Sequence, residues 1–229
     1  MTHLIVGGTS GIGLNLARRF LEDDPKVVVA GRRTPDSLSV VPLDIDHTFR
    51  FIDDLDYIVK TYSPFETVVY NPGFRQMGRI DELSDDDIIK MGNVGFTACA
   101  LLMSRVMRAQ ESLPLLVAVT STSEFTPRER ESVYSGTKRG LGGFVRSLSR
   151  DERIRKTLVV APAGTKTAFW FGSDQDTSSY LEASWVADQI KTLLADEYRF
   201  RYAHILRDPP RVDIVETEYW PDAEIDETE

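Results

Sequence analysis

Short, continuous runs of apolar residues recur along the chain, separated by polar and glycine-rich segments. Continuous runs, rather than alternating apolar and polar positions, are typical of strands that helices cover on both faces, as in a parallel sheet. The predicted strands are residues 4–6, 27–30, 40–43, 67–70, 115–120 and 157–161.

The segments between these strands have helical patterns. Apolar residues recur every four positions over 12–20 and over 51–59. Ser84 precedes three aspartates, a combination that favours the start of a capped helix. Because strands and helices alternate, we predict an α/β protein with a Rossmann-like, doubly wound parallel sheet.

Composition indicates one domain, since 229 residues with 41% apolar content can bury one substantial core. The net charge of −9 is concentrated at the end of the chain, because residues 213–229 hold eight acids and no Lys or Arg. The remainder has 27 basic and 28 acidic residues, which argues against a nucleic-acid partner. We predict a folded domain over residues 1–212 and an acidic tail over 213–229 that extends into solvent.

Other features bear on location and metal chemistry. The sequence has no run of eighteen apolar residues and no basic region at its start, so we expect a cytoplasmic protein that binds no membrane. Cys99 stands among apolar residues and is expected to be a packed thiol rather than a nucleophile. His3, His47 and His204 are scattered, and we predict no metal site.

A glycine-rich turn joins the first strand to the first helix in Gly7-Gly8-Thr9-Ser10-Gly11-Ile12-Gly13. Glycines at 7, 11 and 13 permit a tight turn and let backbone amides approach a pyrophosphate at the positive end of the helix. An ordinary strand-to-helix turn is the alternative.

The second predicted strand ends in Gly31-Arg32-Arg33, where an NAD site usually places an acid. Two guanidiniums suit the 2′-phosphate of NADP(H), so we predict that NADP(H) is preferred and that NAD(H) remains possible. Alternatively, the two arginines are solvated loop residues.

Tyr134 and Lys138 stand four residues apart, with Ser121 thirteen residues before Tyr134. Residues at this spacing share a helix face, so the Lys138 ammonium can lie near the phenol and is expected to lower its pKa. Alone, the pair could be an ordinary helical surface pair. Combined with the glycine turn, it indicates proton transfer beside a dinucleotide.

In these motifs the chain resembles the short-chain dehydrogenase/reductase family over roughly residues 4 to 190. The resemblance implies that residues 1–212 form an NAD(P)-binding catalytic domain. It also implies a tetrad of Asn93, Ser121, Tyr134 and Lys138. Besides Tyr134, Lys138, Arg32 and Arg33, the implied cofactor-binding residues are Gly7, Thr9, Ser10, Gly11, Ile12, Gly13, Asp44, Ile45, Asn71, Gly73, Pro162, Thr165 and Thr167.

By this resemblance Tyr134 is the general acid/base for hydride transfer between nicotinamide and a carbonyl or hydroxyl carbon. Lys138 would also hold the nicotinamide ribose, and Ser121 would hydrogen-bond the substrate oxygen. Asn93 would hold a water that connects Lys138 to solvent. Ser121 could instead satisfy backbone groups at a strand end, and Asn93 could cap a turn.

The chain departs from the family pattern at Tyr70, Pro72 and Ala163, which alters turn geometry more than chemistry. Its end, residues 204–210, lacks the Asp-Gly-Gly turn that often follows the family's last strand, which puts one common subunit interface in doubt. We expect a homodimer formed by helices near 84–110 and 133–150, with a homotetramer as the alternative.

The substrate pocket is expected to involve residues 74–80, 122–131 and 168–182, with 169–180 as a lid. The aromatic residues in these segments, Phe74, Phe125, Phe169, Trp170 and Phe171, would favour an apolar carbonyl or alcohol substrate or could be core packing. Arg75, Arg128 and Arg130 could meet an anionic substrate or be solvated. The rival functions are a non-catalytic NADP(H)-binding redox sensor and a nucleotide-sugar epimerase or dehydratase, which would need a larger C-terminal region.

Overall fold

The computed structural model describes residues 1–32, 38 and 40–221, and within them an eight-stranded sheet. The strand order is β10-β9-β6-β5-β4-β1-β2-β3, with every neighbouring pair parallel except β9 and β10. The strands are β1 (Thr2–Val6), β2 (Val27–Gly31), β3 (Val40–Pro42), β4 (Phe65–Tyr70), β5 (Leu113–Val119), β6 (Ile154–Pro162), β9 (Phe200–Arg207) and β10 (Pro210–Glu218). The order reverses at β1 and β4, which confirms the predicted doubly wound sheet.

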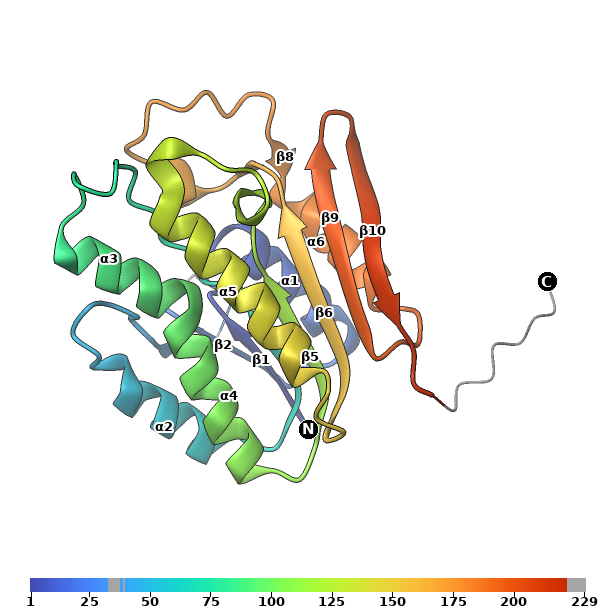
Figure 1. Cartoon of the computed structure of the whole chain (residues 1–229). Helices are drawn as coiled ribbons and strands as arrows, with labels where there is room; N and C mark the ends of the chain where they lie inside the picture. The colour runs from blue at the N-terminus through green and yellow to red at the C-terminus, as the bar shows by residue number, and fades with distance from the viewer. Residues whose placement is uncertain (33–37, 39, 222–229) are drawn as a thin grey trace.

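Helices cover both faces of the sheet (Figure 1). They are α1 (Gly11–Asp23), α2 (Phe51–Tyr62), α3 (Asp85–Gly92), α4 (Ala98–Ala109), α5 (Ser132–Leu148) and α6 (Ala183–Leu193). One core cluster joins the sheet to α2, α4 and α5, and the other joins its opposite face to α1 and α6. The continuous apolar runs therefore arise because both faces of the central strands are buried.

Local signals fix where several elements begin. The Ser84 hydroxyl accepts a hydrogen bond from the Asp87 N–H, as predicted for the cap of α3.

A π-helical segment, Asn93–Thr97, joins α3 to α4, and Gly95 packs there against Thr137 of α5. Cys99 is fully buried and burial raises its thiol pKa to about 12, in keeping with a packed thiol.

The C-terminal region differs from the prediction of a solvent-extended tail beginning at residue 213. β10 pairs antiparallel with β9, and the predicted boundary falls inside this strand. Its acids have partners, because Glu216 pairs with Arg146, and Glu218 pairs with Arg150 at 2.7 Å. Residues 222–229 lie outside the described part of the chain.

Within the described residues, no helix combines the length and apolar character needed to cross a bilayer.

Candidate active site

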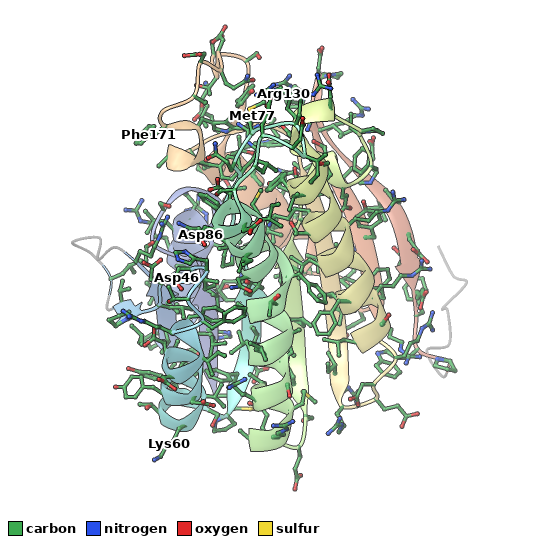
Figure 2. All side chains as sticks on the ribbon, turned by 60° about the vertical axis from the view of Figure 1, so that its left-hand side comes forward. Asp46, Lys60, Met77, Asp86, Arg130 and Phe171 are labelled. Atoms are coloured by element: carbon green, nitrogen blue, oxygen red, sulfur yellow. The ribbon has the colours of Figure 1, made fainter. Side chains whose placement is uncertain are left out.

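A cleft of about 530 Å³ lies at the carboxyl ends of the parallel strands. This is where ligands bind in open α/β sheets. Figure 2 shows Met77, Arg130 and Phe171 gathered at one end of the molecule, with Lys60 at the opposite end. The loops that follow β4 and β5 meet there, since the Gly78 N–H donates to the Arg130 carbonyl at 3.0 Å.

The cleft brings most of the predicted residues together. Its walls include Gly7, Thr9, Ser10, Gly11, Ile12, Arg32, Asp44, Ile45, Asn71, Gly73, Ser121, Tyr134, Lys138, Pro162, Thr165 and Thr167. Gly13 and Asn93 are not among the described residues that line the cleft. Arg33 lies outside the part of the chain that the structure describes.

The glycine turn is built so that side chains would not fit. Gly7 and Gly11 have φ angles of 73° and 55°, in the left-handed region that glycine tolerates. A Cβ on Gly13 would lie 2.3 Å from the Gly7 carbonyl oxygen and 2.7 Å from the Asn71 amide nitrogen. Asn71 fixes the turn, because its side chain donates to the Gly7 carbonyl at 3.1 Å.

The amino-terminal end of α1 opens into this turn. The Ser10 side chain makes no capping hydrogen bond, and the first helical turn, described in full, contains no acid. The unpaired N–H groups and the positive end of the helix dipole therefore favour an anion such as a pyrophosphate.

The end of the cleft next to β2 contains Arg32 and Asp44. The two side chains lie 3.8 Å apart and are 58% and 66% exposed, so their ion pair is weak and leaves the guanidinium accessible. Gly31 lets Thr9 pack against the end of β2, where an added Cβ would meet the Thr9 methyl at 2.6 Å.

Tyr134 and Lys138 lie on one face of α5, both buried, with 7% and 2% exposure. The Lys138 ammonium donates to the Pro72 carbonyl at 2.9 Å and to the Val119 carbonyl at 3.0 Å. It thereby ties α5 to the loop after β4 and to the end of β5. Pro72 supplies only its carbonyl here, so its departure from the family pattern does not remove the contact.

The expectation that Lys138 lowers the phenol pKa is wrong for the protein alone. Burial raises the pKa of Tyr134 to about 12, although a hydrogen bond with Ser121 opposes the rise. Burial likewise lowers the pKa of Lys138 to about 8. Sequence spacing places Tyr134 and Lys138 on one helix face but does not show how deeply they are buried, and desolvation is the largest influence on both pKa values.

Ser121 and Asn93 occupy different positions relative to the cleft. Ser121 lines it and also accepts a hydrogen bond from the Ser123 N–H at 3.1 Å, so it satisfies a backbone group at the strand end, while its contact with the substrate oxygen stays a prediction. The Asn93 side chain donates to the Asp46 carbonyl at 2.7 Å, and Asn93 begins the π-helical segment. Such segments are frequent at functional sites, and the water-holding role of Asn93 stays a prediction.

The segment after β6 folds over the cleft. Short strands β7 (Thr165–Lys166) and β8 (Leu181–Glu182) pair and so join the two ends of this segment. The Phe169 ring lies 5.9 Å from the Tyr134 ring, and Trp170 donates to the Thr165 carbonyl at 2.9 Å. Phe171 is 82% exposed, so the aromatic run divides between the cleft wall and the surface.

Sequence reasoning missed a buried ionic cluster next to Tyr134. The Glu131 carboxylate accepts from Arg75 at 2.7 Å, from Arg128 at 3.0 Å and from the Ser123 hydroxyl at 2.9 Å. Burial would raise the pKa of Glu131, but these partners hold it below its usual value. The sequence signal that could have indicated this cluster is the spacing of Glu131, which stands three residues before Tyr134.

Glu124 is a second missed acid; it ends the short 3-10 segment Thr122–Glu124 after β5 and packs against Gly142, one turn of α5 beyond Lys138. One oxygen of the Glu124 carboxylate accepts a hydrogen bond from the Tyr202 hydroxyl. The other oxygen has no hydrogen-bond partner among the described residues, and a Cβ added to Gly142 would lie 3.4 Å from it. Burial raises the pKa of Glu124, although the Tyr202 hydrogen bond opposes this.

A Glu124→Gln variant is expected to gain stability relative to wild type as the pH rises. The folded protein holds the Glu124 proton more tightly than the unfolded chain, so wild type loses stability as the pH rises above the unfolded value of 4.5. Glutamine removes this penalty and keeps an acceptor for Tyr202. Urea unfolding from about pH 4 to about pH 8 measures the difference; a constant or decreasing difference would contradict the assignment.

Among the described residues, no group of three or more His, Cys, Asp or Glu side chains is arranged to hold a metal ion.

A family model described as short chain dehydrogenase matches residues 2–177. This is most of the chain, and the protein therefore belongs to the short-chain dehydrogenase family of oxidoreductases. The resemblance drawn from the motifs is confirmed.

Individual relatives are distant. The chain is 25% identical over 152 residues to the 3-oxoacyl-(acyl-carrier-protein) reductase MabA of Mycobacterium avium, a match that covers 65% of this chain and 60% of that protein. It is 26% identical over 156 residues to the cyclic-di-GMP-binding biofilm dispersal mediator protein of Escherichia coli (strain K12), covering 66% of each. The chain thus spans less than two thirds of the length of these relatives.

A solved structure of a short-chain dehydrogenase from Sphingobium yanoikuyae in complex with NADPH superimposes with a TM-score of 0.72 and 20% identity. The match covers 83% of each chain. At this identity the likeness supports the fold.

Proposed function

We propose that this protein is an NADP(H)-dependent carbonyl reductase or alcohol dehydrogenase with Tyr134 as its general acid/base. The observation that carries the proposal is one cleft that joins the open amino-terminal end of α1 to the buried Tyr134 and Lys138. A dinucleotide bound with its pyrophosphate at α1 would extend toward Tyr134. NADPH, when bound, supplies hydride to a carbonyl carbon.

Tyr134, Ser121 and Lys138 have distinct proposed roles around the substrate carbonyl carbon. Tyr134 carries its proton at pH 7, since the ordinary pKa of tyrosine is already near 10 and burial raises it to about 12, so in carbonyl reduction it can donate that proton. Ser121, which interacts with the phenol, would donate to the substrate oxygen. Lys138, held by two carbonyls, would bind the nicotinamide ribose and bring positive charge to the phenol once the cofactor is in place.

The preference for NADP(H) rests on Arg32, whose guanidinium stays accessible beside Asp44. Arg32→Ala is expected to raise the KM for NADPH by roughly tenfold, because a charge-assisted contact with the 2′-phosphate is lost. The KM for NADH should change less than about twofold, since NADH lacks that phosphate. Steady-state kinetics with both cofactors measures this, and equal changes would refute the preference.

The proposed activity is tested by following NADPH oxidation by absorbance across ketones, quinones, acyl thioesters and oxo acids. We expect NADPH-dependent reduction of at least one class. NADPH binding without oxidation in any class would favour a regulator.

A non-catalytic NADP(H)-binding regulator is the second candidate. The observation in its favour is the 26% identity to a protein named as a cyclic-di-GMP-binding mediator of biofilm dispersal. The buried Tyr134 and Lys138 argue for the enzyme, because a sensor has no need of a proton donor beside the nicotinamide.

We further propose a homodimer formed through α4 and α5. β10 covers the outer edge of β9, so a partner could not pair with β9 there.

A further inference from the structure

The cluster around Glu131 has an unbalanced charge. Arg75 and Arg128 share this single carboxylate. The Arg75 and Glu131 side chains are only 7% and 6% exposed, whereas the Arg128 side chain is 43% exposed. One positive charge is therefore left over beside a buried ion pair, and an anionic ligand in the cleft would balance it and accept hydrogen bonds from the guanidiniums.

Arg75 is held ready for such a ligand. Its guanidinium lies 4.4 Å from the centre of the Trp170 ring and 5.5 Å from that of Phe169. Stacking fixes the plane of the guanidinium and leaves its N–H groups at the edge, where a carboxylate binds in a fork. One N–H group contacts Glu131, and Arg75 also lines the cleft.

The cleft as a whole is positive although the protein is acidic. Its described walls carry two acids, Asp44 and Glu131, and six bases, which are Arg32, Arg75, Lys90, Arg128, Lys138 and Arg207. Asp44 lies at the end of the cleft next to β2, beside Arg32. The end next to Tyr134 thus has an excess of positive charge beyond what Lys138 contributes.

We propose that Arg75 and Arg128 bind the carboxylate of a small 2- or 3-oxo acid, or of the matching hydroxy acid. This inference rests on the proposed function. Glu131 precedes Tyr134 by three residues, Ser123 follows Ser121 by two, and all four line the same cleft as Arg75 and Arg128. The cluster therefore neighbours the reacting groups, which suits a small substrate whose carboxylate is one or two carbons from the carbonyl.

NADPH, Tyr134 and solvent supply the hydride and the protons that the reaction needs. The carbonyl carbon receives hydride from NADPH, and its oxygen receives the Tyr134 proton, which gives the hydroxy acid and NADP⁺. A solvent proton then restores the phenol. The carboxylate is unchanged and serves only for recognition.

The test compares an acid with its ester. The kcat/KM for NADPH-dependent reduction is measured with acetoacetate and methyl acetoacetate, and with 2-oxobutanoate and its methyl ester. We expect at least one acid to exceed its ester by about tenfold or more, because the charge-assisted contacts are lost in the ester. Comparable values for both pairs would overturn the inference.

Arg128→Met and Arg130→Met form a matched pair of variants. Arg128 contacts Glu131, whereas Arg130 pairs with Glu82 at 2.9 Å and lies outside the cleft wall. Arg128→Met should reduce the acid-to-ester ratio at least about fivefold, mainly through KM. Arg130→Met should leave the ratio as in wild type. Equal ratios in the two variants would contradict the proposal, and Arg128 is exposed enough that its loss should not prevent folding.

A binding measurement separates this inference from the proposed function. Isothermal titration calorimetry follows acetoacetate and 2-oxobutanoate binding to the complex with NADP⁺, which cannot reduce them. Binding that Arg128→Met weakens, without turnover of any carbonyl compound, would support the anion site and overturn the reductase. Turnover of neutral ketones without preference for acids would support the reductase and overturn the anion site. Neither binding nor turnover would overturn both.

Discussion

Replacing Tyr134 by phenylalanine is expected to lower kcat about 10³-fold while leaving the Kd for NADPH within about threefold of wild type. The phenol is buried in the cleft and neutral at pH 7, so it is the group that can protonate a substrate oxygen. Phenylalanine keeps the packing of the ring against Phe169 and loses only the hydroxyl. Turnover and NADPH fluorescence measure the two quantities.

Tyr62→Phe is the matched control for this change. Tyr62 ends α2 and is not among the described residues that line the cleft, so this variant should give wild-type turnover. A Tyr134→Phe variant with more than about a tenth of wild-type kcat would exclude Tyr134 as the required proton donor.

Gly13→Ala is expected to have the largest effect on the cofactor turn. The new Cβ would lie 2.3 Å from the Gly7 carbonyl oxygen, a main-chain atom that cannot move without shifting the turn. We expect a loss of about 1–3 kcal/mol in the free energy of unfolding, the range for forced overpacking. The Kd for NADPH should rise at least about tenfold, since ~1.4 kcal/mol of lost contact suffices.

Gly143→Ala provides the control with the same chemical change. Gly143 lies on α5 with nothing within 4 Å of its added Cβ, so alanine should stabilise the helix by about 0.5–1 kcal/mol. Urea unfolding and NADPH titration of both variants give the comparison. Equal unfolding free energies for Gly13→Ala and wild type would show that the turn is not constrained as described.

The sequence predicted the sheet and the cleft well because their signals are local. Continuous apolar runs mark doubly covered strands, and a glycine turn followed by a helix places unpaired backbone N–H groups at the helix start. Tyr134 and Lys138 were found for the same reason, since helical spacing alone puts them on one face.

What the sequence did not predict depends on partners distant in the chain. The acids of β10 resembled a tail because Arg146 and Arg150, their partners, are about 70 positions earlier. Arg75 and Glu131 are 56 residues apart, so no local pattern joins them. The pKa of Tyr134 depends on burial, which spacing does not reveal.

The central claim is that one cleft holds NADP(H) with its nicotinamide beside Tyr134. A crystal structure with NADPH tests it most directly. We predict the pyrophosphate at the start of α1, the 2′-phosphate at Arg32, and the Tyr134 hydroxyl facing the nicotinamide with room for a carbonyl group between them. A nicotinamide bound away from Tyr134, or a Tyr134 ring turned toward bulk solvent, would contradict the account.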